Sequence, residues 1–279
     1  MKSTGKHKRP FFHYLGMWGA VSTGLVYFGI GLIAILSFLQ IKKGGADEGS
    51  MFVYLHQFIA GRILVWIILT GMISYIVWRI YETIRDPYSY GKDLEGIAKR
   101  SIAAFSSIAD GLIAFSAIQA LLNSGSASKT GIPDAERELV ADILSKPGGD
   151  WIIKIIAIII CLTALVQFGY VIIKGYMERL DIHHLNNDKR FVIHFLAWSG
   201  HFSRGIILGI IGVFLYKATV SGNPNEVVNT DKAFDFIGDD VGHLYFIIVA
   251  LGTILYGVFM ILFGIFYDSD KDYKKKKQK

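Results

Sequence analysis

Two oppositely charged residues lie in the middle of long apolar runs. Asp110 falls ten residues into the run 100–122, and Arg204 falls eleven residues into the run 193–217. In a helix, a rise of about 1.5 Å per residue places each charge about 15 Å from the start of its run. A charge at that depth in an apolar medium is costly and marks a functional candidate. We interpret the two residues as a buried ion pair that fixes helix packing; the alternative is a proton or ion site.

Histidines offer a second chemistry, because neutral imidazole binds metals and haem iron. His194 and His201 are seven residues apart and share one helix face, but only His201 lies well inside a run. A haem held by two histidines needs one on each of two facing helices, so we expect no haem. His183, His184 and Asp188 lie in a polar connection and are only weak candidates for metal ligands, because a solvated loop accounts for them. We expect no metal site and no cofactor.

Motifs of common enzymes are absent from the sequence, which has no phosphate-binding loop, no dinucleotide fingerprint, no H-E-x-x-H and no nucleophile elbow. The single cysteine, Cys161, lies in an apolar run and cannot form an intramolecular disulfide. We therefore expect a protein that is not an enzyme.

The elements that carry these residues are long apolar segments. The chain is 52% hydrophobic and 19% charged, which is too apolar for an ordinary soluble domain. Each segment approaches or exceeds the ~20 residues that span a bilayer, and backbone groups in lipid require helices. The sequence predicts an all-α membrane protein with six transmembrane helices, at 14–41, 62–79, 100–122, 151–174, 193–217 and 241–267.

Basic residues indicate the orientation of these helices. The two termini and the second and fourth connections carry 19 of the 29 Lys and Arg residues. The positive-inside rule then places both termini in the cytoplasm. These basic residues lie at the ends of apolar runs and in the basic tail 269–279. This placement indicates contact with a lipid bilayer and no nucleic acid. The sequence does not identify protein partners and leaves the formation of a homo-oligomer open.

An internal repeat organises the chain. Residues 181 positions apart match without a gap, as in the pairs Gly19/Gly200, Ser22/Ser203, Gly24/Gly205, Gly31/Gly212, Gly61/Gly242, Gly71/Gly252 and Tyr75/Tyr256. The middle third keeps the spacing from the first-helix glycine to the second-helix glycine, 38 residues from Gly111 to Gly149 against 37 in the other two copies. We expect repeats at about 10–90, 98–182 and 191–268. The second helix of the middle copy fits two registers.

Glycines and short amphipathic stretches complete the predicted architecture. Small residues let membrane helices approach closely, so we assign helix packing to Gly24, Gly31, Gly111, Gly205, Gly209 and Gly212. Each odd connection ends in a short amphipathic stretch, which we interpret as an interfacial helix. In the middle one, Pro133 suits the first turn, and one face carries Leu139, Val140, Ile143 and Leu144.

The repeated unit resembles a known family. Its first helix reads approximately G-x4-G-(V/I/L)-(V/I)-x3-G, and its second helix ends in G-x3-Y-x2-W-R. The first copy carries these motifs as Gly19, Gly24, Gly71, Tyr75, Trp78 and Arg79. The third copy carries Gly200, Arg204, Gly205, Gly252 and Tyr256. This pattern resembles the bacterial integral-membrane family catalogued as domain of unknown function 1206. The family's basic residue before the first-helix glycine is kept only as Arg204, because Thr23 and Asp110 replace it. The resemblance implies a fold, in a bacterial inner (plasma) membrane, and no chemistry.

The sequence therefore predicts six transmembrane helices as three parallel two-helix repeats with pseudo-threefold symmetry. We expect a non-enzymatic structural or accessory membrane component. The alternative is a channel or transporter for a small solute or ion, with a site near Asp110 and Arg204 that includes Thr23 and His201. An intramembrane enzyme or haem carrier is the third possibility.

Overall fold

Helices make up the regular structure wherever the chain is described. The computed structural model describes residues 11–41, 45–85, 91, 97, 118, 132–180, 182 and 185–266. Within these ranges the long helices are α1 (Phe11–Phe38), α3 (Ile59–Arg85), α6 (Gly149–Ile172), α7 (Asn187–Ser221) and α9 (His243–Ile265). All five are long and apolar enough to cross a membrane. They coincide with five of the six predicted segments; the sixth, 100–122, lies outside the described residues.

A short helix precedes the second long helix of each predicted two-helix repeat. These short helices are α2 (Glu48–His56), α5 (Asp134–Leu144) and α8 (Thr230–Phe236), the last continued by the π-helix η3 (Ile237–Val241). Two further short turns of 3-10 helix are η1 (Gly175–Arg179) and η2 (Pro224–Glu226). Side-chain caps start α2 and α8: Asp47 accepts from the Ser50 N–H, and Asn229 accepts from the Lys232 N–H.

The predicted apolar face of α5 needs one correction. Val140 is buried against α6 and α7, and Ile143 and Leu144 pack beside it. Leu139, however, is 56% exposed, because it lies about 100° around the helix from the buried Val140, at the edge of the packed face. Pro133 is the N-cap residue rather than a member of the first turn.

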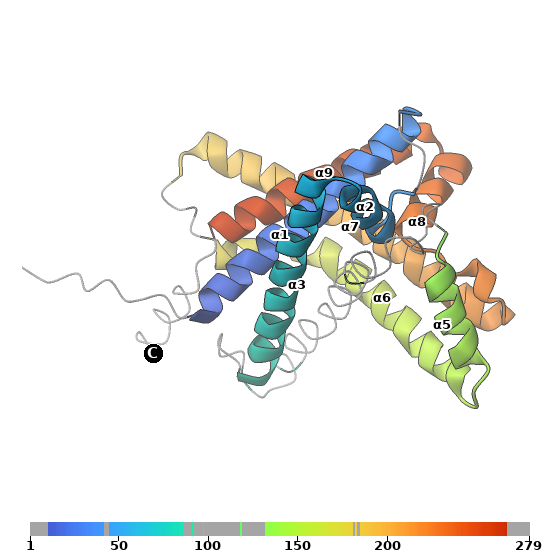
Figure 1. Ribbon diagram of the computed structural model, residues 1–279. Helices are drawn as coiled ribbons and strands as arrows, with labels where there is room; N and C mark the ends of the chain where they lie inside the picture. The colour runs from blue at the N-terminus through green and yellow to red at the C-terminus, as the bar shows by residue number, and fades with distance from the viewer. Residues whose placement is uncertain are drawn as a thin grey trace, which may run out of the picture.

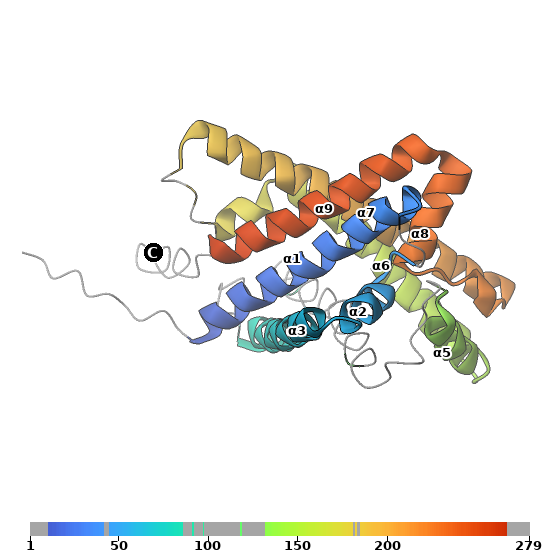
Figure 2. The same cartoon turned by 45° about the horizontal axis from the view of Figure 1, so that its top comes forward.

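The long helices pack in a definite order. α1 and α9 run side by side along their length, and α9 also packs against α7 (Figure 2). α3 packs on α1, and α6 packs on α7. The beginning of α1 and the end of α9 lie at one end of the bundle, whereas α2 and α8 lie at the other (Figure 1). Helices of one predicted repeat therefore contact helices of the next.

Glycines bring helix backbones of different repeats into contact in the same way twice. A Cβ at Gly31 of α1 would lie 2.9 Å from the Ala250 carbonyl oxygen and 2.8 Å from the Ile254 nitrogen of α9. A Cβ at Gly212 of α7 would lie 3.3 Å from the carbonyl oxygen of Ala157 and 3.0 Å from the nitrogen of Cys161. Ala157 and Cys161 of α6 each lie 93 positions before their α9 counterparts, Ala250 and Ile254.

The next glycine pair repeats this correspondence. Gly24 packs on Ile261 of α9, and Gly205 packs on Phe168 of α6. Phe168 again precedes its α9 counterpart, Ile261, by 93 positions. With this separation Gly149 aligns with Gly242, and its contact with the Ile143 carbonyl matches that of Gly61 with the Leu55 carbonyl. These contacts select one of the two registers that the sequence left open for α6.

Contacts within the first and third repeats also match. Gly19 packs against the Tyr75 side chain, and Gly200 packs against Tyr256, whose Cα would be 2.5 Å from an added Cβ. In addition, the hydroxymethyl groups of Ser22 and Ser203 fill the space beside Gly71 and Gly252, respectively. The 181-residue correspondence in the sequence is therefore also a correspondence of helix contacts.

Gly209 differs from the other predicted packing glycines. The nearest atom to a Cβ at this position would be the Ala164 Cβ at 3.9 Å, an ordinary van der Waals distance. An alanine would fit there, so the close approach predicted for Gly209 is not found. Gly111, also predicted to pack closely, lies outside the described residues.

We predict that Gly31→Ala destabilises the protein by about 1–3 kcal/mol, because the added methyl group must push α1 away from α9. Gly169→Ala is the matched control, since nothing lies within 4 Å of a Cβ at Gly169 in α6. It should leave stability unchanged or raise it by up to about 1 kcal/mol. Thermal unfolding midpoints in detergent measure both effects, and equal midpoints for the two variants would contradict close packing at Gly31.

Candidate functional site

Arg204 is enclosed by aromatic rings in the interior of the bundle. Its side chain is buried, and Nη1 donates a hydrogen bond to the hydroxyl oxygen of Tyr256. The guanidinium carbon lies 4.9 Å from the ring centre of Tyr27 and 5.0 Å from that of Tyr256. The two rings meet edge to face at 4.9 Å. Helices α7, α1 and α9 thus form a cation–π clamp around one charge.

Backbone packing positions this clamp. Gly200, one helical turn before Arg204, lets the backbone of α9 approach α7 at Tyr256. Gly24, one turn before Tyr27, brings α1 against α9 in the same way. Each glycine therefore places a tyrosine where its ring reaches the guanidinium. We name Arg204, Tyr27 and Tyr256 the arginine clamp.

A buried histidine lies one turn away from the clamp. Nδ1 of His201 is 2.6 Å from Oε1 of Gln167 on α6. Because an amide oxygen only accepts, Nδ1 of the imidazole donates this bond. Nε2 is buried and has no hydrogen-bond partner among the described residues. The rings of Tyr170, Tyr256 and Phe259 surround the imidazole with centres 5.2, 5.2 and 5.4 Å away.

The other predicted polar candidates are placed as follows. Thr23 is buried and its hydroxyl lies 3.8 Å from the Met72 sulfur, so it bonds to α3. Asp110, the predicted partner of Arg204, lies outside the described residues, and the ion pair stays a prediction. The described residues contain no group of three or more His, Cys, Asp or Glu side chains that could hold a metal ion.

Tyr27 and Tyr256 are functional candidates that sequence reasoning missed. Tyr256 was recognised as the repeat counterpart of Tyr75, and Tyr75 also has an arginine partner. Nη2 of Arg79 donates to the Tyr75 hydroxyl at 2.6 Å, and its guanidinium carbon lies 4.8 Å from the ring centre. In the first copy the arginine comes from the same helix, whereas in the third it comes from the neighbouring helix. The repeated tyrosine was the signal that could have found the clamp.

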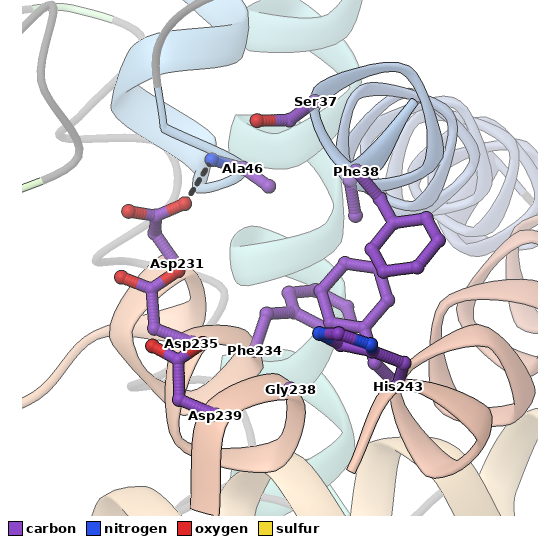
Figure 3. A pocket seen from close by; sticks show the side chains of 11 residues that line it. Ser37, Phe38, Ala46, Asp231, Phe234, Asp235, Gly238, Asp239 and His243 are labelled. Atoms are coloured by element: carbon purple, nitrogen blue, oxygen red, sulfur yellow. Dashed lines mark hydrogen bonds between the residues drawn. The ribbon is translucent and has the colours of Figure 1, made fainter. Parts of the chain in front are cut away.

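A pocket of about 200 Å³ opens at the end of the bundle near α2 and α8. One wall carries three carboxylates spaced four residues apart, those of Asp231, Asp235 and Asp239 (Figure 3). The opposite side is aromatic, with Phe38 stacked on Phe246 at 5.0 Å. Phe234 and His243 complete the aromatic side.

Charges in this pocket are unevenly compensated. Lys232 bonds to Asp235 at 2.6 Å, so the Asp231 carboxylate relies on the Ala46 N–H and on the more distant charge of the same lysine. Burial raises the pKa of Asp231 from 3.8 to about 6, although a hydrogen bond from the Ala46 N–H opposes the shift. The sequence indicated only an acidic connection here, because the pocket depends on α1 and α9 meeting α8.

We predict that Tyr256→Phe destabilises the protein by about 1–3 kcal/mol, because it removes the hydroxyl that accepts from buried Arg204. Tyr75→Phe is the matched control: it removes the same hydroxyl from the first copy, where Arg79 is half-exposed and water can replace it. Its effect should stay below about 1 kcal/mol. Unfolding midpoints of both variants in detergent check this, and an equal or larger loss for Tyr75→Phe would contradict the importance of the clamp.

Comparisons with known proteins agree with the repeated architecture. A family described as Domain of Unknown Function (DUF1206) matches three successive parts of the chain, 18–86, 103–173 and 199–266. An uncharacterized protein of Bacillus subtilis (strain 168), YxxB, is 25% identical over 267 residues, which cover 95% of each chain. No solved structure matches the chain significantly. The chain carries three tandem copies of this domain and belongs to the DUF1206 family.

Proposed function

We propose that the protein is a non-enzymatic integral membrane protein, a structural or accessory component of a bacterial plasma membrane. The arginine clamp is the observation that carries this proposal. The guanidinium of Arg204 is engaged by Tyr27 and Tyr256, and His201 is bonded to Gln167. Arg204 and His201 therefore each bond to a side chain of a neighbouring helix, as expected of groups that fix packing, although Nε2 of His201 has no partner among the described residues.

We further propose six membrane spans in three repeats with pseudo-threefold symmetry. Two contacts between repeats support this arrangement. The second helix of the middle copy, α6, packs on α7 of the third copy, and α9 of the third copy packs on α1 of the first. The glycine contacts of both pairs correspond residue by residue. A closed ring requires a third contact, between α3 and the predicted helix 100–122.

The proposed orientation follows from the basic residues. Both termini face the cytoplasm under the positive-inside rule. The acidic ends of α2, α5 and α8 then face the outside, because the beginning of α1 and the end of α9 lie at the opposite end of the bundle (Figure 1). We call the end with α2 and α8 the outer end.

A channel or transporter for a small cation is the second candidate. The pocket at the outer end favours it, because Asp231, Asp235 and Asp239 line one wall and attract cations. Translocation would also need a polar path from this pocket past Arg204, whose positive charge repels cations. The first proposal is therefore preferred.

Ion flux distinguishes the two candidates. Purified protein is reconstituted into liposomes loaded with KCl, and potassium efflux and proton influx are followed after dilution into sodium buffer. We predict rates equal to those of protein-free liposomes, because the interior polar groups are packed. Vesicles with a pore-forming peptide verify the assay. Efflux that requires the protein and that Asp231→Asn reduces would contradict the structural proposal and favour the transporter.

A further inference from the structure

The beginnings of α2 and α8 are joined across the outer end by polar contacts. The Ala46 N–H donates to Oδ1 of Asp231. The Thr230 hydroxyl lies 3.2 Å from Oε1 of Glu48. Nδ2 of Asn229 lies 3.4 Å from Oδ2 of Asp47. In all three contacts the acceptor is a carboxylate, and we name this set of contacts the outer junction.

Residues at equivalent cap positions meet in this junction. Asp47 and Asn229 both cap the helix that follows them, and Glu48 and Thr230 are the first residues of α2 and α8. Asp47 therefore bonds to the other cap residue and Glu48 to the other first residue, in pairs 182 positions apart. Because α2 belongs to the first repeat and α8 to the third, the junction joins the two repeats at the outer end.

Negative charge accumulates around the junction. The charge of Asp47, the N-cap residue of α2, acts on both Glu48 and Asp231, and α5 contributes Glu136, whose charge acts on Glu48. The nearby cations are Lys232, bonded to Asp235, and Arg137, which donates to the Val227 carbonyl at 3.3 Å. Along the same wall of the pocket η3 presents Asp239, and on the opposite side α9 presents His243 (Figure 3).

Burial makes these carboxyl groups retain protons. Burial and the neighbouring charge of Asp47 raise the pKa of Glu48 from 4.5 to about 7. Burial likewise raises the pKa of Asp231 to about 6 and that of Glu136 above its usual value. Raised pKa values mean that the closed junction binds protons more tightly than separated, solvated helices would.

We propose that the outer junction is a proton-operated latch: protonated carboxyl groups hold α2 against α8, and their ionisation lets the helices separate. The sign follows from linkage. Closing takes up protons, so the closed state is favoured as pH falls from about 7 toward the ordinary carboxyl values, and it loses this advantage above pH 7. Between pH 8.5 and 5.5 the closing equilibrium should gain at least about tenfold, and on the order of a hundredfold if Glu48 and Asp231 both bind a proton.

The latch controls access to the pocket at the outer end. Ala46 and Asp231 belong to the junction and also line the pocket. Separation of α2 from α8 would remove Ala46 from the pocket wall and uncover the Asp231 carboxylate. A proton-operated latch would therefore keep the pocket closed in acid and favour its opening above pH 7.

Spin labels on the two helices test the latch in the full-length protein in nanodiscs. The labels replace Tyr54 of α2 and Val241 at the end of η3, both exposed, in a Cys161→Ala background. Double electron–electron resonance is recorded at pH 5.5 and pH 8.5. We expect one short distance at pH 5.5 and a second, longer population at pH 8.5. An unchanged distance distribution at the two pH values would overturn the proposal.

Variants identify the groups responsible. Glu48→Gln with Asp231→Asn replaces both carboxyl groups by neutral amides, so the short distance should persist at pH 8.5. Asp142→Asn is the control, because Asp142 is exposed and paired with Lys146 in α5, and it should keep the wild-type pH response. A wild-type response in the double variant would also overturn the latch. If the double variant does not fold, Glu48→Gln alone should reduce the long population at pH 8.5 at least about threefold, and no reduction would contradict the proposal.

Discussion

A guanidinium group held among apolar helices must find its partners within the protein. Arg204 meets this requirement through the π-faces of two tyrosines and a phenol oxygen, which come from helices far apart in the sequence. The tyrosines reach it only because α1, α7 and α9 lie in backbone contact, and that contact requires glycine at positions such as Gly24 and Gly200. The glycines therefore allow the backbone contact that brings the tyrosines to Arg204, and without that contact the buried charge would lack these partners.

The outer end follows a different physical rule. Short helices α2 and α8 begin there with carboxylate and amide caps, which stabilise helix starts by accepting backbone N–H groups. Because the repeats converge, these acidic starts are brought together and become mutually repulsive. A protein built by repeating one unit thus concentrates like charges where the copies meet, and protons relieve the repulsion. The interior and the outer end are linked through α1 and α9, which carry residues of both.

Much of the fold was predictable because bilayer thickness and hydropathy dictate helix length. The apolar runs predicted α1, α3, α6, α7 and α9, and the glycine spacing predicted where backbones touch. The arginine clamp was not predictable in the same way, since a repeat alignment identifies equivalent residues but not which neighbouring helix a side chain reaches. The same limit hid the link from Thr23 to Met72 and the outer junction, in which every contact joins residues 182 to 185 positions apart.

The proposed structural role requires a packed and dry interior around the arginine clamp, and cysteine accessibility measures this directly. Thr23→Cys and Thr253→Cys introduce thiols at two buried positions in a Cys161→Ala background, and Ser221→Cys introduces one at the exposed outer end of α7. With a charged, membrane-impermeant thiol reagent applied to intact cells and to inverted vesicles, we expect labelling of Ser221→Cys from outside only and no labelling of the other two from either side. Labelling of Thr23→Cys or Thr253→Cys at a rate comparable to that of Ser221→Cys would reveal a water-filled path and contradict a packed interior.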